Sequence, residues 1–361
     1  VQSRDVEATT DACWRGNPRR TGEYRTEGVP ELGGLKWKFS TGGKVRSGAV
    51  VFDGVVYVGS DGGHFHAIDA ETGKERWSIP VTGGVRSSAC VAGGVVFFGG
   101  NDGKLYAVDA KTGETVWIAE SRSYLSSSPL VAHGMVFMSG PVGLDLKTGK
   151  QVWKPRGARF NGFRYPIERS VAVVGESVVE GSGRCDLETA KFSFGGGTWA
   201  RQVTDAVVDG VIYSCQTGVG GGMYGDKGNG TLHAIDLRTG DDKWARITHR
   251  QGTPQAWREV LMCSPAVHEG VVYIGSEHGE LFALDAAEGT QLWSLDVGSA
   301  LRSAPSISTR DGTLYFGAAD GKLYALDAKS GKKKWEYQTN GKIVSSPCPA
   351  GGCVYIGSDD G

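Results

Sequence analysis

Three arginines stand at the same position of a repeated sequence pattern, each directly before the serine that opens a β-rich segment. They are Arg46, Arg86 and Arg302. A guanidinium group binds a carboxylate or another anion through paired hydrogen bonds, so converging guanidinium groups would form an anion site. The alternative, which the sequence favours, is that each arginine pairs with an acidic residue of a neighbouring turn. The candidate partners are Asp61, Asp102 and Asp320.

A second set of side chains suited to recognition lies in four long connections between predicted strands. Arginine and aromatic residues are enriched at the energetic centres of protein interfaces, and long loops in a compact domain are often functional. The alternative is that these loops pack on one another, with their arginines solvated. The candidate partner-binding residues are Arg156, Arg159, Phe160, Phe163, Arg164, Tyr165, Trp199, Arg201, Tyr224, His249, Arg250, Trp257 and Arg258.

The sequence contains none of the common motifs for a catalytic nucleophile or a zinc site. The chain has no Gly-x-Ser-x-Gly elbow, and its seven histidines are scattered over turns and strands. Its seven cysteines form no Cys-x-x-Cys pair and no Cys/His cluster at zinc spacing. We therefore predict neither a catalytic residue nor a metal site. Cys348 and Cys353 flank a glycine-rich turn, and both a disulfide and two free buried thiols are compatible with that spacing.

Composition narrows the function classes. The net charge of the 361-residue chain is −1, so no overall field favours nucleic acid or an anionic membrane. No run of 18 apolar residues predicts a transmembrane helix, and the polar opening "VQSRDVEATT" is no signal peptide. A mature or trimmed chain would look the same, so export stays open. Glycine, at 57 residues, is about twice as frequent as usual, which suits many short strands joined by tight turns.

The strands that position these side chains are predicted from a repeated unit, of which "AIDAETGKERW" at residues 67–77 is one copy. Between successive units lie runs rich in β-branched and aromatic residues, separated by turn dipeptides such as Asp53-Gly54. Each repeat predicts four antiparallel strands in about 40 residues, which is typical of a propeller blade. The aspartate-to-aromatic part of the unit recurs at Asp69–Trp77, Asp109–Trp117, Asp145–Trp153, Asp186–Phe194, Asp236–Trp244, Asp285–Trp293 and Asp327–Trp335.

The number of hairpins predicts an all-β, eight-bladed β-propeller over residues 35–361. An N-terminal lead-in segment, residues 1–34, either wraps the disc or serves as a tether. The last repeat lacks its fourth strand, and we expect the strand around Trp37 to join this C-terminal blade and close the ring. Because its third strand is missing too, we expect the natural chain to run past Gly361. The hairpins begin near Arg46, Arg86, Leu125, Arg169, Thr204, Met262, Arg302 and Val344.

The repeated unit is predicted to be a structural joint. Aspartate and threonine accept or share hydrogen bonds in the turn, glycine adopts the positive φ that the turn needs, and tryptophan brings a large apolar face with one N–H donor. A single active site does not need so many copies. We expect the tryptophans to dock neighbouring blades, and they are Trp37, Trp77, Trp117, Trp153, Trp244, Trp293 and Trp335.

Together with the pattern "SSPxVxxGxVYVGSxDGxLYALD", this unit closely resembles the pyrroloquinoline-quinone-type repeat. The resemblance covers roughly residues 35–361, and "CWRGNPRRTG" at residues 13–22 is similar to the lead-in segment of bacterial members. It implies one of two branches: quinone- and calcium-dependent dehydrogenases, or non-catalytic propellers such as the scaffold lipoprotein of the outer-membrane β-barrel assembly machinery. Both are typically exported, which implies a periplasmic or cell-surface location.

The non-catalytic branch fits the residues better. Dehydrogenases of this type carry an adjacent Cys-Cys disulfide, a Ca²⁺ site with carboxylate and amide ligands, and a catalytic aspartate. This chain has no Cys-Cys pair, and its five asparagines, Asn17, Asn101, Asn161, Asn229 and Asn340, suggest no calcium amide. Fold alone does not imply function. We expect no cofactor; quinone and Ca²⁺ belong to the alternative function.

Blade topology places the candidate binding residues together. In a four-stranded blade, the connections between second and third strands and those between blades lie on one face of the disc. All four long connections are of these kinds and fall in adjacent blades three to six. The sequence thus predicts a cell-envelope scaffold that docks another protein or an envelope complex on this face. The alternatives are a quinoprotein dehydrogenase and a small-ligand or glycan sensor that uses the channel mouth. Oligomeric state is not predicted.

Overall fold

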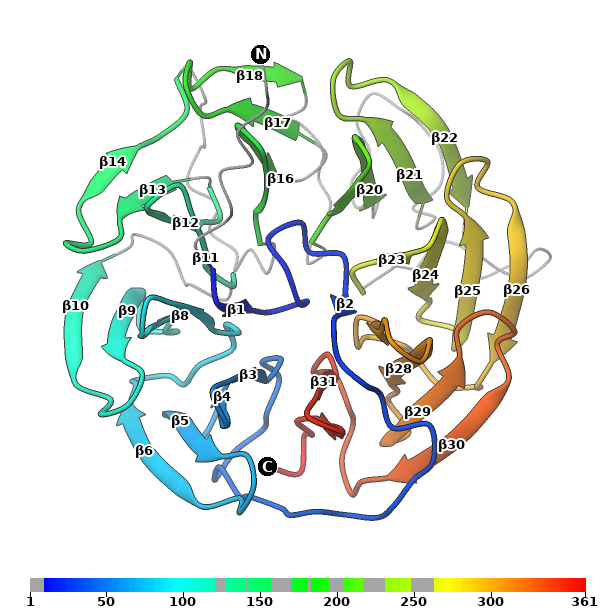
Figure 1. Ribbon diagram of the computed structural model, residues 1–361, viewed down its shortest axis with the longest axis horizontal. Helices are drawn as coiled ribbons and strands as arrows, with labels where there is room; N and C mark the ends of the chain where they lie inside the picture. The colour runs from blue at the N-terminus through cyan, green and yellow to red at the C-terminus, as the bar shows by residue number, and fades with distance from the viewer. Residues whose placement is uncertain are drawn as a thin grey trace.

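The protein is a ring of antiparallel β-sheets around a central channel (Figure 1). The computed structural model describes residues 10–120, 127–140, 142–156, 170–180, 183–194, 204–216, 231–247 and 263–361. Within these residues, seven blades have four consecutive strands, with the first strand innermost and the fourth at the rim. No helix in the described ranges is long and apolar enough to cross a bilayer.

The strands of the seven blades repeat the same order, and each blade is named here by its place in the chain. Blades one to three are β3 (Val50–Phe52), β4 (Val55–Gly59), β5 (His64–Asp69) and β6 (Glu75–Pro80); β7 (Cys90–Ala92), β8 (Val95–Gly99), β9 (Lys104–Asp109) and β10 (Thr115–Glu120); and β11 (Leu130–Ala132), β12 (Met135–Met138), β13 (Val142–Asp145) and β14 (Gln151–Trp153). Blades four and five are β15 (Ala172–Val174), β16 (Ser177–Glu180), β17 (Gly183–Asp186) and β18 (Phe192–Phe194); and β19 (Ala206–Val208), β20 (Val211–Gln216), β21 (Thr231–Asp236) and β22 (Asp242–Ile247). Blades six and seven are β23 (Ala266–His268), β24 (Val271–Gly275), β25 (Glu280–Asp285) and β26 (Gln291–Asp296); and β27 (Ser306–Ser308), β28 (Thr313–Gly317), β29 (Lys322–Asp327) and β30 (Lys333–Gln338).

The prediction of eight blades is wrong. The residues expected to form the last blade make a two-stranded hairpin, β31 (Cys348–Ala350) and β32 (Cys353–Tyr355). Residues 35–40, expected to close the ring as a strand, are not part of any sheet. The reason is that a fourth strand needs a third strand beside it to form a ladder, and no segment of the described chain lies between β32 and residues 35–40 to supply it.

The repeated unit joins one blade to the next. In blade one, Asp69 Oδ1 accepts hydrogen bonds from Thr72 N and Thr72 Oγ1, both at 2.8 Å. Gly73 follows with φ of 71°, and a Cβ added there would lie 2.6 Å from Trp37 Cγ. Glycine is therefore required at position 73 for two reasons: the turn needs a positive φ, and the ring of Trp37 leaves no room for a Cβ atom.

The N-terminal segment occupies the centre of the ring. Its strand β1 (Ala12–Cys13) pairs antiparallel with β7, and β2 (Glu23–Tyr24) pairs parallel with β27. Between them, the carbonyls of residues 18, 19, 21 and 22 accept backbone hydrogen bonds of 2.8 to 3.0 Å from the first strands of blades four to seven. Figure 1 shows β1 and β2, in dark blue, beside the innermost strands. Residues 10–24, the channel segment below, thus line or fill the channel, and residues 1–9 lie outside the described part.

Candidate functional site

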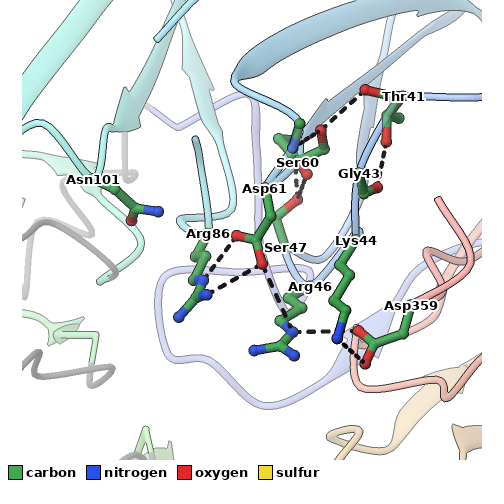
Figure 2. Close-up of polar contacts among 12 residues, drawn as sticks. Thr41, Gly43, Lys44, Arg46, Ser47, Ser60, Asp61, Arg86, Asn101 and Asp359 are labelled. Atoms are coloured by element: carbon green, nitrogen blue, oxygen red, sulfur yellow. Dashed lines mark hydrogen bonds and ion pairs between the residues drawn. The ribbon is translucent and has the colours of Figure 1, made fainter. Parts of the chain in front are cut away.

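The first strands and the turns between second and third strands bring charged groups together at the channel mouth (Figure 2). Asp61 accepts two bonds from Arg86, Nε to Oδ1 at 2.8 Å and Nη2 to Oδ2 at 3.2 Å. Arg46 Nε lies 3.3 Å from Asp359 Oδ1 and 4.0 Å from Asp61 Oδ2. Lys44 Nζ lies 3.7 Å from the other oxygen of Asp359. The result is a continuous chain of alternating charges across the hairpin and blades one and two.

The third arginine of the set is paired in the same way. Arg302 Nε and Nη2 donate to the two carboxylate oxygens of Glu277 at 2.9 and 3.2 Å. The three guanidinium groups therefore do not form a shared anion site, because each already has a carboxylate partner. Of the three aspartates expected as partners, Asp61 pairs with arginine; the hydroxyls of Tyr106 and Tyr324 bond the other two at 2.6 and 3.0 Å.

These ion pairs are only partly shielded from water. The Arg46 and Arg86 side chains are 34% and 39% exposed, while Asp61 is 20% exposed. An exposed pair of this kind contributes about 0–1 kcal/mol to folding. The mouth is thus nearly neutral in charge where its arginines lie, and its pairs fix the positions of neighbouring turns more than they stabilise the ring.

A belt of hydroxyl groups joins the first strands of successive blades just inside the mouth. Each hydroxyl accepts a backbone N–H from the preceding blade, so these buried N–H groups have partners although no ladder links the blades. The bonds run from Gly48 N to Ser88 Oγ at 2.8 Å, Ser88 N to Ser128 Oγ at 3.0 Å, Ser128 N to Ser170 Oγ at 2.8 Å, Ser170 N to Thr204 Oγ1 at 3.0 Å and Thr204 N to Ser264 Oγ at 2.9 Å. Blades one to six are therefore linked in sequence around the channel.

Two arginines of the channel segment are fully buried at the centre. Arg20 Nη1 donates to Trp14 O at 2.7 Å, Nη2 donates to the carbonyls of Ser128 and Pro129 at 3.1 and 2.9 Å, and Nε donates to Val171 O at 3.2 Å. Its guanidinium carbon also lies 5.6 Å from the centre of the Trp14 ring. A buried cation without such acceptors would be strongly unfavourable, and here carbonyl dipoles of blades three and four supply them.

Arg15 uses the opposite side of the ring. It donates through Nε to Arg20 O at 2.8 Å, through Nη1 to Ser264 O at 3.2 Å, and through Nη2 to Pro265 O. Burial lowers the pKa of Arg15 to about 10, and the neighbouring Arg20 charge acts in the same direction. The group stays charged at neutral pH. Arg15 and Arg20 thus tie blade six to blades three and four through one short segment.

A titratable pair holds the end of the channel segment. His268 Nδ1 lies 2.8 Å from Glu23 Oε1, and the His268 side chain is 12% exposed. The hydrogen bond with Glu23 raises the pKa of His268 despite its burial. Burial alone would raise the pKa of Glu23, but hydrogen bonds from His268 and Thr21 hold it below its usual value. This pair links β2 to blade six.

The predicted partner-binding residues fall almost entirely outside the described residues. Arg156 is described: its side chain is exposed, and its backbone N–H donates to Ala190 O at 2.6 Å. The connections that hold the others run between β14 and β15, β18 and β19, β20 and β21, and β22 and β23. These connections start and end on the face that carries the arginine–carboxylate pairs.

The seven tryptophans predicted to dock neighbouring blades all use their indole N–H groups. Each donates its indole N–H to a carbonyl of the segment that lies beside it around the ring. The acceptors of Trp37, Trp77, Trp117, Trp153, Trp244, Trp293 and Trp335 are the carbonyls of Ala70, Ala110, Leu146, Leu187, Ala286, Ala328 and Val29, at 2.6 to 3.2 Å.

The disulfide considered for Cys348 and Cys353 is not formed, and both are free thiols. The hairpin register explains this, because it places Cys353 opposite Ala350 and Cys348 opposite Tyr355. Burial raises the pKa of Cys348 to about 12, so its thiol stays protonated and unreactive at neutral pH.

Sequence reasoning missed Arg15, Arg20 and the hydroxyl belt. The available signals were the motif "CWRGNPRRTG", with its arginines, and the serine or threonine that recurs just before each first strand. Among the described residues, no group of three or more His, Cys, Asp or Glu side chains is arranged to hold a metal ion.

Comparison with known proteins agrees with this geometry. A family model described as outer membrane protein assembly factor BamB matches residues 29–246 and 228–361. The chain belongs to this family of pyrroloquinoline-quinone-type repeat propellers. Over 101 residues it is 30% identical to the outer membrane protein assembly factor BamB of Xanthomonas campestris pv. campestris, covering 28% of this chain and 22% of the relative.

Family members with enzymatic names are equally similar. Over 94 residues the chain is 33% identical to the 1-butanol dehydrogenase (cytochrome c) of Thauera butanivorans, covering 26% of this chain and 12% of the relative. The solved quinohemoprotein alcohol dehydrogenase of Comamonas testosteroni superposes with a TM-score of 0.70 at 17% identity, covering 96% of this chain and 75% of that one. This last likeness shows the fold alone. The chain spans less than a quarter of the length of these curated relatives.

Proposed function

We propose that this member of the family is a non-catalytic scaffold of the bacterial cell envelope that binds another protein. The observation that carries the proposal is the channel segment. Arg15 and Arg20 hold the centre of the ring with both guanidinium groups fully buried and bonded to carbonyls. A channel ligand such as a quinone would have to displace these bonds. The described residues at the centre thus serve to hold the ring together and do not fit a cofactor cradle.

The charged groups at the mouth support the same function. A site for an anionic cofactor or substrate needs cations that are available, whereas the three arginines predicted for this role are already bonded to Asp61, Asp359 and Glu277. The similarity to assembly factor BamB and the export typical of the family motivate the envelope location. We place the partner on the mouth face, over the long connections of blades three to six.

Two measurements test the proposal. First, the purified protein is mixed with pyrroloquinoline quinone and Ca²⁺, and the quinone absorbance and dye-linked oxidation of alcohols are recorded. We expect neither a bound chromophore after gel filtration nor turnover. A stoichiometric chromophore with turnover would replace the scaffold by the dehydrogenase that the enzymatic relatives suggest.

The second measurement addresses the partner face. Chemical cross-linking in an envelope extract is compared for the wild type, for a Trp199→Ala/Trp257→Ala variant and for a Lys74→Ala/Lys111→Ala control. The control residues are exposed in turns on the opposite face of the disc. We expect the tryptophan variant to lose a cross-linked species that the control retains. Equal cross-linking of all three proteins would show that the long connections are not the docking surface.

A further inference from the structure

Two cysteines face one another where the channel segment pairs with blade two. In the register of β1 with β7, Cys13 lies directly opposite Cys90. The two residues are 77 positions apart in the chain, and both are free thiols in the structure. In no other strand pair of the described blades, hairpin and channel segment does one cysteine stand opposite another. The pair therefore differs from Cys348 and Cys353, which the hairpin register keeps apart.

The type of strand pairing brings the two side chains close together. Trp14 N donates to Ala89 O at 3.3 Å, so the bonded positions lie beside the cysteines, and Cys13 and Cys90 form a non-hydrogen-bonded pair. In such a pair the Cα atoms are about 4.5 Å apart, and the side chains lie on the same face of the ladder. Disulfides span Cα separations of about 4.4–6.8 Å. The backbones of β1 and β7 are therefore spaced as a disulfide requires.

Both thiols lie in the same buried environment. Cys13 is 4% exposed and Cys90 is fully buried, and both pack in one apolar cluster with Leu130 and Phe137 of blade three. Burial raises the pKa of both thiols, that of Cys90 to about 12. Because the thiolate is the reactive form, the two cysteines react slowly with any reagent while the channel segment is in place.

Blade two is connected to the channel segment mainly through β1. The carbonyls outside the segment that accept from Arg15 and Arg20 lie in blades three, four and six, and the backbone bonds to residues 18–22 come from blades four to seven. Blade two pairs with the two residues of β1, and Gly93 N donates to Asp11 Oδ2 at 2.7 Å. A covalent bond at this place would fix the start of the segment, whereas Arg15 and Arg20 fix its middle.

We propose that Cys13 and Cys90 form a disulfide that joins the channel segment covalently to blade two when the protein meets a thiol–disulfide oxidant. Disulfides form and persist in oxidising compartments such as the periplasm. The presence of this bond in the cell therefore rests on the envelope location proposed above, whereas the capacity of the two cysteines to form it rests on the strand register.

The oxidation balances with a small disulfide, such as oxidised glutathione, as the oxidant. The thiolate of one cysteine attacks a sulfur of the oxidant, which forms a mixed disulfide and releases one molecule of reduced thiol. The thiolate of the second cysteine then attacks the protein sulfur of the mixed disulfide and releases the other reduced thiol. Two protons and two electrons thus pass from the cysteine pair to the oxidant.

Burial and chain position determine when the bond can form. Because the docked segment shields both sulfurs, the exchange takes place before β1 has settled against β7 or while the segment is open. Cys90 follows Cys13 by 77 positions, whereas the blade-six acceptors of Arg15 follow it by 249 and 250. The two cysteines can therefore be joined while the later blades are still incomplete. Once the ring has closed, the same burial protects the disulfide from reduction.

Linked peptides identify the bond. Reduced protein is treated with oxidised glutathione, both in the folded state and during refolding from urea, and is then alkylated and digested with trypsin without reductant. We expect residues 5–15 to be recovered covalently attached to residues 87–104, with the higher yield after refolding. The oxidised protein should contain two thiols fewer than the reduced protein when both are unfolded. Dithiothreitol should break the link rapidly in urea and slowly under native conditions.

Thermal unfolding shows whether the bond holds the ring together. For a closed loop of this length, the oxidised protein should unfold about 3–6 °C above the reduced protein. Cys90→Ala should lose both the link and this shift, and if it does not fold, Cys13→Ala removes the other sulfur. The matched control is Cys348→Ala/Cys353→Ala, since it removes two thiols that do not stand opposite one another. The control should keep both the link and the shift.

Three results would overturn the inference. They are absence of the linked peptides after refolding with oxidised glutathione, a disulfide that joins Cys13 or Cys90 to a different cysteine, and equal unfolding midpoints of the oxidised and reduced protein. These measurements need neither a quinone nor a partner protein, so this inference and the scaffold proposal fail separately. If the link forms with glutathione but the protein taken from its native cells is reduced, the chemistry of the pair stands and the envelope location is wrong.

Discussion

Removal of the buried guanidinium group of Arg20 should weaken the whole ring. The change is Arg20→Met, which keeps an apolar stem of similar length and removes the four hydrogen bonds to the carbonyls of residues 14, 128, 129 and 171. The matched control is Arg25→Met, because Arg25 is exposed just beyond β2.

The magnitude follows from what those carbonyls lose. A buried acceptor left without a partner costs about 1–3 kcal/mol, so four of them give a gross loss of at least about 4 kcal/mol. Two effects act in the opposite direction: a buried cation no longer has to be desolvated, and Arg15 loses a like charge nearby. We expect a net destabilisation of about 3 kcal/mol. With about 2.1 cal/mol/K of unfolding entropy per residue, this lowers the Tm by roughly 4 °C.

The assay is thermal unfolding by circular dichroism, together with limited trypsin digestion followed by N-terminal sequencing. Arg20→Met should be cleaved between residues 10 and 25 well before the blades are, whereas Arg25→Met should resemble the wild type. Equal midpoints and equal cleavage of the two variants would refute the assignment of Arg20 as the central anchor of the ring.

Three further substitutions test contacts between neighbouring blades and between the channel segment and blade six. Trp77→Phe loses the indole bond to a carbonyl of blade two, 3.1 Å long, and part of its packing, so we expect about 1–2 kcal/mol lower stability in urea unfolding; no change would argue against a docking role. Glu23→Gln should lower stability by at most about 1 kcal/mol. The pKa of His268 is raised above 6.5, and the pKa of Glu23 is lowered below 4.5. The stability difference between the variant and the wild type should therefore be largest between these two pH values. It should shrink above the raised pKa of His268 and at strongly acidic pH. Asp61→Asn should change the free energy of unfolding by less than about 1 kcal/mol, and it removes one negative charge beside Arg46 and Arg86, which should be detected as tighter retention on a cation exchanger.

The repeated unit predicted the blades well because its chemistry is local. Asp69 and Thr72 make their hydrogen bonds within four residues, and the glycine between them and the next strand takes the φ that its position requires. The number of blades could not be obtained in this way. A hairpin and a tryptophan are local signals, whereas a blade needs all three ladders between its four strands. Trp37 makes its indole bond to Ala70 without any ladder at all.

The central anchor was beyond reach of the sequence for a different reason. The partners of Arg15 and Arg20 are carbonyl groups, which every residue has, so no side-chain pattern marks Ser128, Pro129 or Ser264 as acceptors. The ion pairs at the mouth were partly predictable, because Asp61 lies in a repeated turn. Asp359 and Glu277, the other acceptors, could be recognised only after the blades had been placed around the ring.

The channel segment also sets the order in which the protein can be completed. Arg15 bonds the carbonyl of a residue 249 positions later, and β2 pairs with β27, whose residues are more than 280 positions away. These are the contacts that loop closure makes slowest to form. During synthesis Arg15 and β2 emerge more than 240 residues before their partners in blades six and seven. Residues 10–24 can therefore reach their final contacts only after all seven blades have been synthesised and arranged around the ring.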